Sequence, residues 1–132
     1  MRVLNSEDYY HYLFNETRTS LKQDSDKTIC IRIPKNRGNK TRIVLYGAGK
    51  FGKQFHGLIE GEDDLELVAW VDINQSKKNG EIIHPGAITD LVYDFVYVAI
   101  LSEKVFEEVK SELKQKGVKG SQILWMGTGM SL

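Results

Sequence analysis

Three glycines, Gly47, Gly49 and Gly52, follow the spacing G-x-G-x-x-G between an apolar run and a segment with helical periodicity. Between a strand and a helix, this spacing suits a diphosphate. The first glycine permits a tight reversal, the second leaves no Cβ between backbone and ligand, and the third lets the helix pack on the strand. The helix then directs its first backbone N–H groups at the anion. We therefore expect a nucleotide to bind this turn, through Gly47, Ala48, Gly49, Lys50, Phe51 and Gly52.

Asp72 stands at the end of the next apolar run, 20 residues after Gly52. A carboxylate at this position can accept hydrogen bonds from the ribose hydroxyls of an adenosine-type nucleotide. It would repel a 2′-phosphate, so the pattern favours NAD over NADP. The alternative is that the turn only packs a helix on a sheet and that Asp72 is a solvated strand end.

A P-loop is a second interpretation of the same residues, because positions 47–53 also fit G-x-x-x-x-G-K. The next residue of a P-loop is Ser or Thr, whose hydroxyl holds Mg²⁺. Here it is Gln54, which has no hydroxyl. The sequence therefore disfavours a P-loop.

Metal and disulfide chemistry have little support. The histidines His11, His56 and His84 lie in separate segments without metal-ligand spacing, and Cys30 is the only cysteine. We expect no metal site. We expect each histidine to be structural. His56 falls off the apolar stripe of its helix and should be solvated. His84 precedes Pro85 near the carboxyl edge of the predicted sheet, where a contact with a ligand is the less favoured alternative.

We find no candidate catalytic residues. Tyr46 and Lys50 have the Y-x-x-x-K spacing of short-chain dehydrogenases, but Tyr46 ends a buried strand and cannot serve as that tyrosine. Ser102 is predicted to cap a helix and also to face the ligand crevice, so we count it among the cofactor-binding residues.

Composition narrows the partners. The chain has 132 residues, with 18 basic and 18 acidic side chains. This balance removes the positive field that nonspecific nucleic-acid binding requires. There is no apolar run long enough to span a membrane and no secretory signal at the N-terminus, so we expect a cytoplasmic protein.

We predict that the chain divides into an N-terminal segment, residues 1–40, and a main nucleotide-binding domain, residues 41–132. Residues 6–21 should form a short amphipathic helix, since their apolar residues fall near one face. Residues 28–33 alternate in polarity and stop at Pro34, which is typical of an edge strand, and residues 35–41 suit a linker.

Strands and helices are predicted to alternate in the main domain. Apolar runs at 42–46, 65–71, 95–100 and 122–126, with a short one at 82–83, indicate buried parallel strands. Two helices separate them. The apolar stripe of the first is Phe51, Phe55, Leu58 and Ile59; that of the second is Val105, Phe106, Val109 and Leu113. The predicted fold class is α/β, a Rossmann-like, doubly wound, mainly parallel sheet with an N-terminal helix and edge strand.

The segments RIVLYGAGKFGKQF, LELVAWVD, YDFVYVAI and GVKGSQILW resemble the Rossmann-like domain of bacterial capsular polysaccharide, lipopolysaccharide and teichoic-acid biosynthesis proteins. That domain is similar to the N-terminal part of membrane-linked nucleotide-sugar 4,6-dehydratases. The resemblance covers residues 41–126 and implies that Gly47, Gly49, Gly52 and Asp72 face a nucleotide.

Two functions remain open. The first is a binding module that holds NAD or a nucleotide sugar, has no catalytic residues of its own, and works with a catalytic domain or partner enzyme of the same pathway. The alternative is a small NAD-dependent oxidoreductase or dehydratase acting on a nucleotide sugar, for which no acid or base is visible. The sequence is also compatible with a homo-oligomer.

Overall fold

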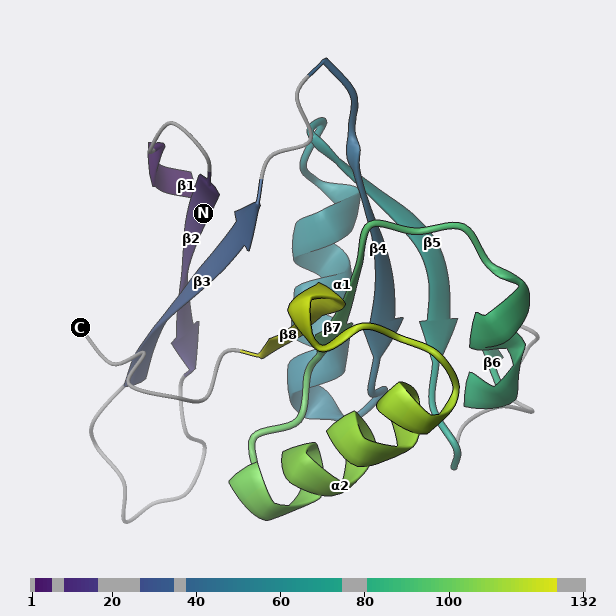
Figure 1. Ribbon diagram of the computed structural model, residues 1–132. Coiled ribbons are helices and arrows are strands. Elements are labelled where there is room, and N and C mark those ends of the chain that lie inside the picture. The colour runs from purple at the N-terminus through teal and green to yellow at the C-terminus, as the bar shows by residue number, and fades with distance from the viewer. Residues whose placement is uncertain (1, 6–8, 17–26, 35–37, 75–80, 126–132) are drawn as a thin grey trace, which may run out of the picture. The chain divides into compact units, whose positions relative to one another are not determined.

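The computed structural model describes residues 2–5, 9–16, 27–34, 38–74 and 81–125, and the side chains from residue 33 onward within these ranges (Figure 1). The chain forms two compact units. One comprises Met1–Lys35 with Met126–Leu132, and the other comprises Asn36–Trp125. The predicted division between residues 40 and 41 stays a prediction.

The first unit contains an antiparallel sheet in place of the helix expected at residues 6–21. Its strands are β1 (Arg2–Asn5), β2 (Tyr9–Glu16) and β3 (Lys27–Pro34), in the order β1-β2-β3. β2 pairs with β3 along its whole length, from Tyr9 opposite Pro34 to Glu16 opposite Lys27. The predicted helix is therefore wrong where it overlaps β2, and its remaining residues, 6–8 and 17–21, lie outside the described ranges.

The physical reason is the composition of β2, YYHYLFNE. Aromatic residues favour an extended, paired backbone, and cross-strand pairing with a neighbour outweighs the weak helical spacing of the apolar residues. The strand predicted at 28–33 is confirmed as β3. It lies at the edge of this small sheet, and not at the edge of the larger one.

The second unit is built on five parallel strands, which confirms the predicted α/β, Rossmann-like, doubly wound sheet. They are β4 (Thr41–Tyr46), β5 (Leu65–Val71), β6 (Ile82–Ile83), β7 (Phe95–Val98) and β8 (Ile123–Trp125), in the order β6-β5-β4-β7-β8. All four strand pairs are parallel. The central strands of such a parallel sheet are covered on both faces, which explains why their sequences are nearly continuous apolar runs.

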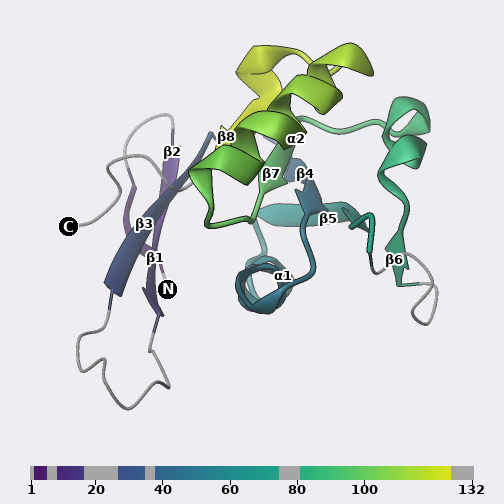
Figure 2. The same ribbon diagram turned by 90° about the horizontal axis from the view of Figure 1, so that it is seen from below.

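The helices α1 (Lys50–Glu60) and α2 (Glu103–Gln115) cover opposite faces of this sheet (Figure 2). On the α2 face, Val44 and Tyr46 pack in one buried cluster with Phe106 and Leu113. Because side chains alternate along a strand, Ile43 and Leu45, which are fully buried, face the other way. A 3-10 helix, η1 (Pro85–Asp90), adds Ile88 to the cluster on the α2 face.

The predicted apolar stripes are largely confirmed. Phe51, Phe55 and Ile59 are buried on α1, whereas Val105 at the start of α2 is 39% exposed and does not join the core as expected. Val105 is the third residue of α2 and so lies in the first turn of the helix, before its buried residues Phe106, Val109 and Leu113.

The strand order places a switch point between β4 and β7. From β4 the chain proceeds outward to β5 and β6, then returns to the other side of β4 for β7 and β8. In open parallel sheets, ligands bind at the carboxyl ends of the strands at such a point. The residues that follow β4, β5, β6 and β7 are Gly47, Asp72, His84 and Ala99.

Within the described part of the chain, neither helix is both long and apolar enough to cross a membrane.

Candidate functional site

The first glycine of the turn reverses the chain at the end of β4. Gly47 has a φ of 117°, a conformation that side chains rarely permit, and a Cβ there would lie 3.0 Å from the Ala99 carbonyl. Its N–H donates to the Val71 carbonyl at 2.8 Å. The tight reversal predicted for Gly47 is therefore confirmed.

The third glycine permits close packing of helix on turn. A Cβ at Gly52 would collide with the backbone carbonyl of Gly47. Because the obstructing atoms belong to the backbone, no side-chain rotation can relieve the clash. The packing role predicted for Gly52 is confirmed.

The second glycine borders open space. No atom lies within 4 Å of a Cβ built at Gly49, and the residue is exposed. Its φ of −76° and ψ of −163° suit any residue. Neither packing nor backbone geometry within the described residues therefore requires glycine at this position, unlike at Gly47 and Gly52.

Helix α1 starts immediately behind this open space, with Gly49 as its N-cap. The cap makes no side-chain hydrogen bond, and the first turn contains no acidic residue. Lys50 and Lys53 are exposed there, whereas the Phe51 side chain is buried and can offer a ligand only its backbone. A helix N-terminus of this kind favours an anion through its backbone N–H groups and dipole.

Asp72 lies directly beside the turn. Its Oδ2 accepts the Ala48 N–H at 2.7 Å, and its Oδ1 accepts the Asn74 N–H at 2.7 Å. The structure thus brings Asp72 and the glycine turn together, and the interpretation of Asp72 as a mere solvated strand end does not describe it. The carboxylate fixes the turn and the chain beyond β5.

Sequence reasoning missed Trp70, which holds the other end of the same peptide unit. Its indole Nε1–H donates to the Gly47 carbonyl at 2.7 Å in a buried hydrogen bond. Trp70 and Asp72 are two residues apart, so they extend from the same side of the β5 chain. The spacing of Trp70 and Asp72 places both at the same end of β5, but nothing in the sequence indicates the hydrogen bond to Gly47.

Ser102 lies on the other side of the switch point. Its Oγ accepts the Val105 N–H at 3.2 Å, which confirms the predicted cap of α2. The segment before Ser102 borders the turn, since a Cβ at Gly47 would lie 3.4 Å from Ile100 Cγ1. Among the described residues, the hydrogen bonds of Ser102 are to Val105 and Phe106 of its own helix and not to the glycine turn.

Exposed apolar side chains gather at the same edge of the sheet. Among the described residues, four large apolar side chains are exposed, and three of them, Ile73, Leu101 and Val105, follow β5 or β7. Flat apolar ligand groups can be covered by such side chains.

The two histidines of this unit have separate environments. His84 is exposed, and its Nδ1 accepts the Gly86 N–H at 2.9 Å, so it caps η1. His56 is not solvated as expected: its side chain is 13% exposed, and its ring stacks on Trp70 with centroids 4.2 Å apart. The buried Trp70 indole covers one face of this ring, and the His56 Nε2 lies 3.6 Å from the Glu60 carboxylate. No group of three or more potential metal ligands occurs among the described residues.

Tyr46 lies beneath the turn and is only 6% exposed. Burial, followed by the negative charges of Glu112 and Asp72, raises the pKa of Tyr46 above its usual 10.0. A buried, neutral phenol fits a structural residue, in agreement with our rejection of the Y-x-x-x-K interpretation.

A family model described as C2185-like, N-terminal matches residues 39–124, which include every site residue considered above. The chain belongs to this C2185-like, N-terminal family. Among solved structures, the family member is similar to UDP-D-quinovosamine 4-dehydrogenase from Vibrio fischeri, with a TM-score of 0.52. The identity is 21% over 65% of this chain and 77% of that one, and a likeness at this level shows the fold alone. A search of curated protein sequences finds no match for the C2185-like chain.

Proposed function

We propose that the second unit of the chain binds a nucleotide with a diphosphate, NAD first and a nucleotide sugar second, as a module without catalytic residues of its own. One observation carries the proposal. The single glycine of the turn that neither strain nor packing requires, Gly49, opens onto free space in front of the uncapped start of α1. A diphosphate is the group that needs both features.

The ribose is assigned to Asp72. Each carboxylate oxygen accepts one backbone N–H, from Ala48 and Asn74, and an ionised carboxylate has about four acceptor positions. Capacity therefore remains for two ribose hydroxyls. The negative charge disfavours a 2′-phosphate, which supports NAD over NADP.

The base is assigned to the exposed apolar side chains at this edge. Ile73 directly follows Asp72 in the loop after β5, and Leu101 lies in the loop after β7, on the other side of β4. A planar base placed between them would cover apolar surface that otherwise faces water.

The pathway proposal rests on the motifs shared with bacterial surface-polysaccharide biosynthesis proteins, and the similar fold of a UDP-D-quinovosamine 4-dehydrogenase supports it. In that setting the module would work in the cytoplasm beside a catalytic domain or enzyme that acts on nucleotide sugars. Ser102, at the cap of α2, would face the ligand from the side opposite the glycine turn.

Calorimetric titration with NAD, NADP, a UDP-sugar and a CDP compound tests the proposal. NAD or the UDP-sugar should bind, and Gly49→Val should abolish that binding without unfolding the protein, because its backbone suits valine and no atom lies within 4 Å of a Cβ there. Gly57→Val is the matched control, since Gly57 is also exposed with open space at its Cβ but lies farther along α1. Absence of binding by all four compounds at millimolar concentration, or equal binding by Gly49→Val, would contradict the proposal.

A further inference from the structure

Both tryptophans of the second unit donate their indole N–H to a loop carbonyl at the carboxyl edge of the sheet. Trp70 Nε1 lies 2.7 Å from the Gly47 carbonyl, and Trp125 Nε1 lies 2.6 Å from the Ile100 carbonyl. The two acceptors follow β4 and β7, the strands on either side of the switch point.

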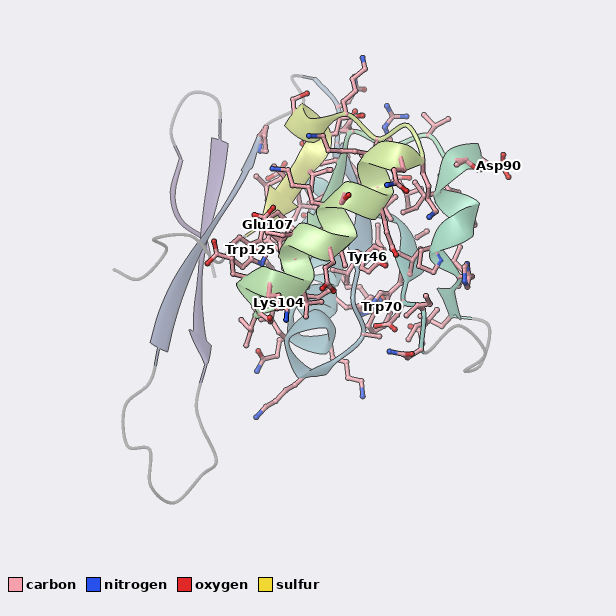
Figure 3. All side chains as sticks on the ribbon, turned by 60° about the horizontal axis from the view of Figure 1, so that its bottom comes forward. Tyr46, Trp70, Asp90, Lys104, Glu107 and Trp125 are labelled. Carbon is pink, nitrogen blue, oxygen red and sulfur yellow. The ribbon has the colours of Figure 1, made fainter. Side chains whose placement is uncertain are left out.

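The two arrangements match in a second respect. Trp70 is on β5, next to β4, and its ring stacks on His56 of α1 at 4.2 Å between centroids. Trp125 is on β8, next to β7, and its ring stacks on Phe106 of α2 at 4.4 Å, with 6° between the planes. Each tryptophan therefore ties a loop and the helix after that loop to the adjacent strand; both are labelled in Figure 3.

From this correspondence we infer that Trp70 and Trp125 are positioning residues that hold the two loops at this edge of the sheet in their binding conformation before a ligand arrives. The inference rests on the proposed function, which places the nucleotide at these loops. It adds residues that fix the loops without touching the ligand.

The Gly47–Ala48 peptide shows why the indole matters. Trp70 holds its carbonyl and Asp72 holds its N–H, so rotation of the peptide plane breaks both hydrogen bonds. Glycine at position 47 allows many backbone conformations, which makes external restraint necessary. Without the Trp70 indole donor, the buried Gly47 carbonyl loses this hydrogen bond. Rotation of the peptide that exposes the carbonyl to water then becomes more favourable.

Amide hydrogen exchange of the ligand-free protein tests the inference independently of any nucleotide. Trp70→Phe keeps an aromatic ring but removes the donor, and should speed exchange of the Ala48 amide by roughly tenfold or more relative to the rest of the sheet. Trp125→Phe should do the same for the Val105 amide, whose partner is Ser102 Oγ. Ile59→Val, a buried change in the last turn of α1, is the control for a general loss of stability.

Faster exchange confined to the Ala48 amide in Trp70→Phe, and to the Val105 amide in Trp125→Phe, supports the positioning role. If amide exchange instead rises evenly over the whole sheet, as expected for Ile59→Val, the positioning role is overturned. Should a variant fail to fold, the parent protein still gives an answer, because both indole protons must exchange at least roughly 100-fold more slowly than in free indole, and rapid exchange of either excludes the arrangement.

Titration with NAD then separates this inference from the proposed function. If the parent binds NAD, Trp70→Phe should bind it roughly fivefold to 100-fold more weakly, whereas Ile59→Val should match the parent. Equal affinity in Trp70→Phe overturns the positioning role while leaving the proposed function intact. If the parent does not bind NAD, the proposed function fails, and the exchange experiment alone decides whether the loops are held.

Discussion

The carboxylate of Asp72 accepts the backbone N–H of Ala48 at 2.7 Å, 24 residues away in sequence. The acid that ends the second strand of the unit is thus part of the glycine turn that follows the first. It has two tasks at one position: fixing the turn and offering its remaining acceptor capacity to a ligand.

Asp72→Asn should separate these tasks. The amide can still accept one backbone N–H but carries no negative charge, so the affinity for NAD should fall while the preference for NAD over NADP narrows. The measurement is calorimetric titration of both dinucleotides. Asp63→Asn, an exposed acid in the turn before β5, should change neither value. If the ratio of the NAD and NADP affinities is unchanged in Asp72→Asn, the Asp72 carboxylate does not contact the ribose.

Gly52→Ala and Gly49→Ala should differ sharply in stability. The first places a Cβ against the Gly47 carbonyl and should cost about 2 kcal/mol or more in the free energy of unfolding, because backbone must move. The second meets no atom within 4 Å and should stay within about 0.5 kcal/mol of the parent. Urea unfolding measures both, and a stable Gly52→Ala protein would contradict the packing described for the turn.

Tyr46 should make the protein less stable in alkali. Its folded-state pKa is raised above the usual 10.0 by burial first and then by Glu112 and Asp72. The folded state therefore disfavours the phenolate. This contribution to stability is complete below pH about 10 and is lost as the pH rises through the folded pKa. Burial raises the pKa of Tyr93 in the same direction.

Urea unfolding between about pH 9 and pH 11 checks this prediction. The decline in stability should be shallower in Tyr46→Phe than in the parent, and shallower again when Tyr93→Phe is added. Lysines titrate in the same range but are common to all three proteins, so their effect cancels in the comparison. Identical slopes would show that neither phenol differs between the folded and unfolded states.

Asp94→Ala should lower stability without changing ligand binding. At the amino end of the sheet, Asp94 Oδ2 accepts the Arg42 N–H at 2.8 Å, and Oδ1 accepts Arg42 Nη2 at 3.2 Å, which joins the starts of β4 and β7. Loss of these charge-assisted hydrogen bonds should cost about 1 to 3 kcal/mol. Chemical unfolding measures the stability, and calorimetry measures the affinity for NAD. If Asp94→Ala binds NAD more weakly than the parent when the same fraction of each protein is folded, the amino and carboxyl edges of the sheet are coupled, contrary to this prediction.

The parallel sheet and the glycine turn could be predicted because local sequence determines them. Apolar runs of strand length and glycines at fixed spacing each have few structural alternatives. The cap at Ser102 was predicted for the same reason, since the side chain satisfies a backbone N–H only three residues away.

The failures involve partners that are distant in sequence. β2 was expected to be helical because its apolar residues were judged without β3, the strand that pairs with it. His56 was expected in solvent because the ring of Trp70 that covers it comes from β5. The Trp70 hydrogen bond to Gly47 spans 23 residues, and no periodicity of a single segment indicates such a contact.

Binding of a nucleotide diphosphate at the open face of Gly49 can be measured directly by an NMR titration of the labelled protein with NAD. The largest shift changes should fall on the backbone amides of Ala48, Gly49 and Lys50, with a second group at Asp72 and Ile73. Shift changes confined to other parts of the chain, or none at millimolar NAD and millimolar UDP-sugar, would show that no diphosphate binds at this turn.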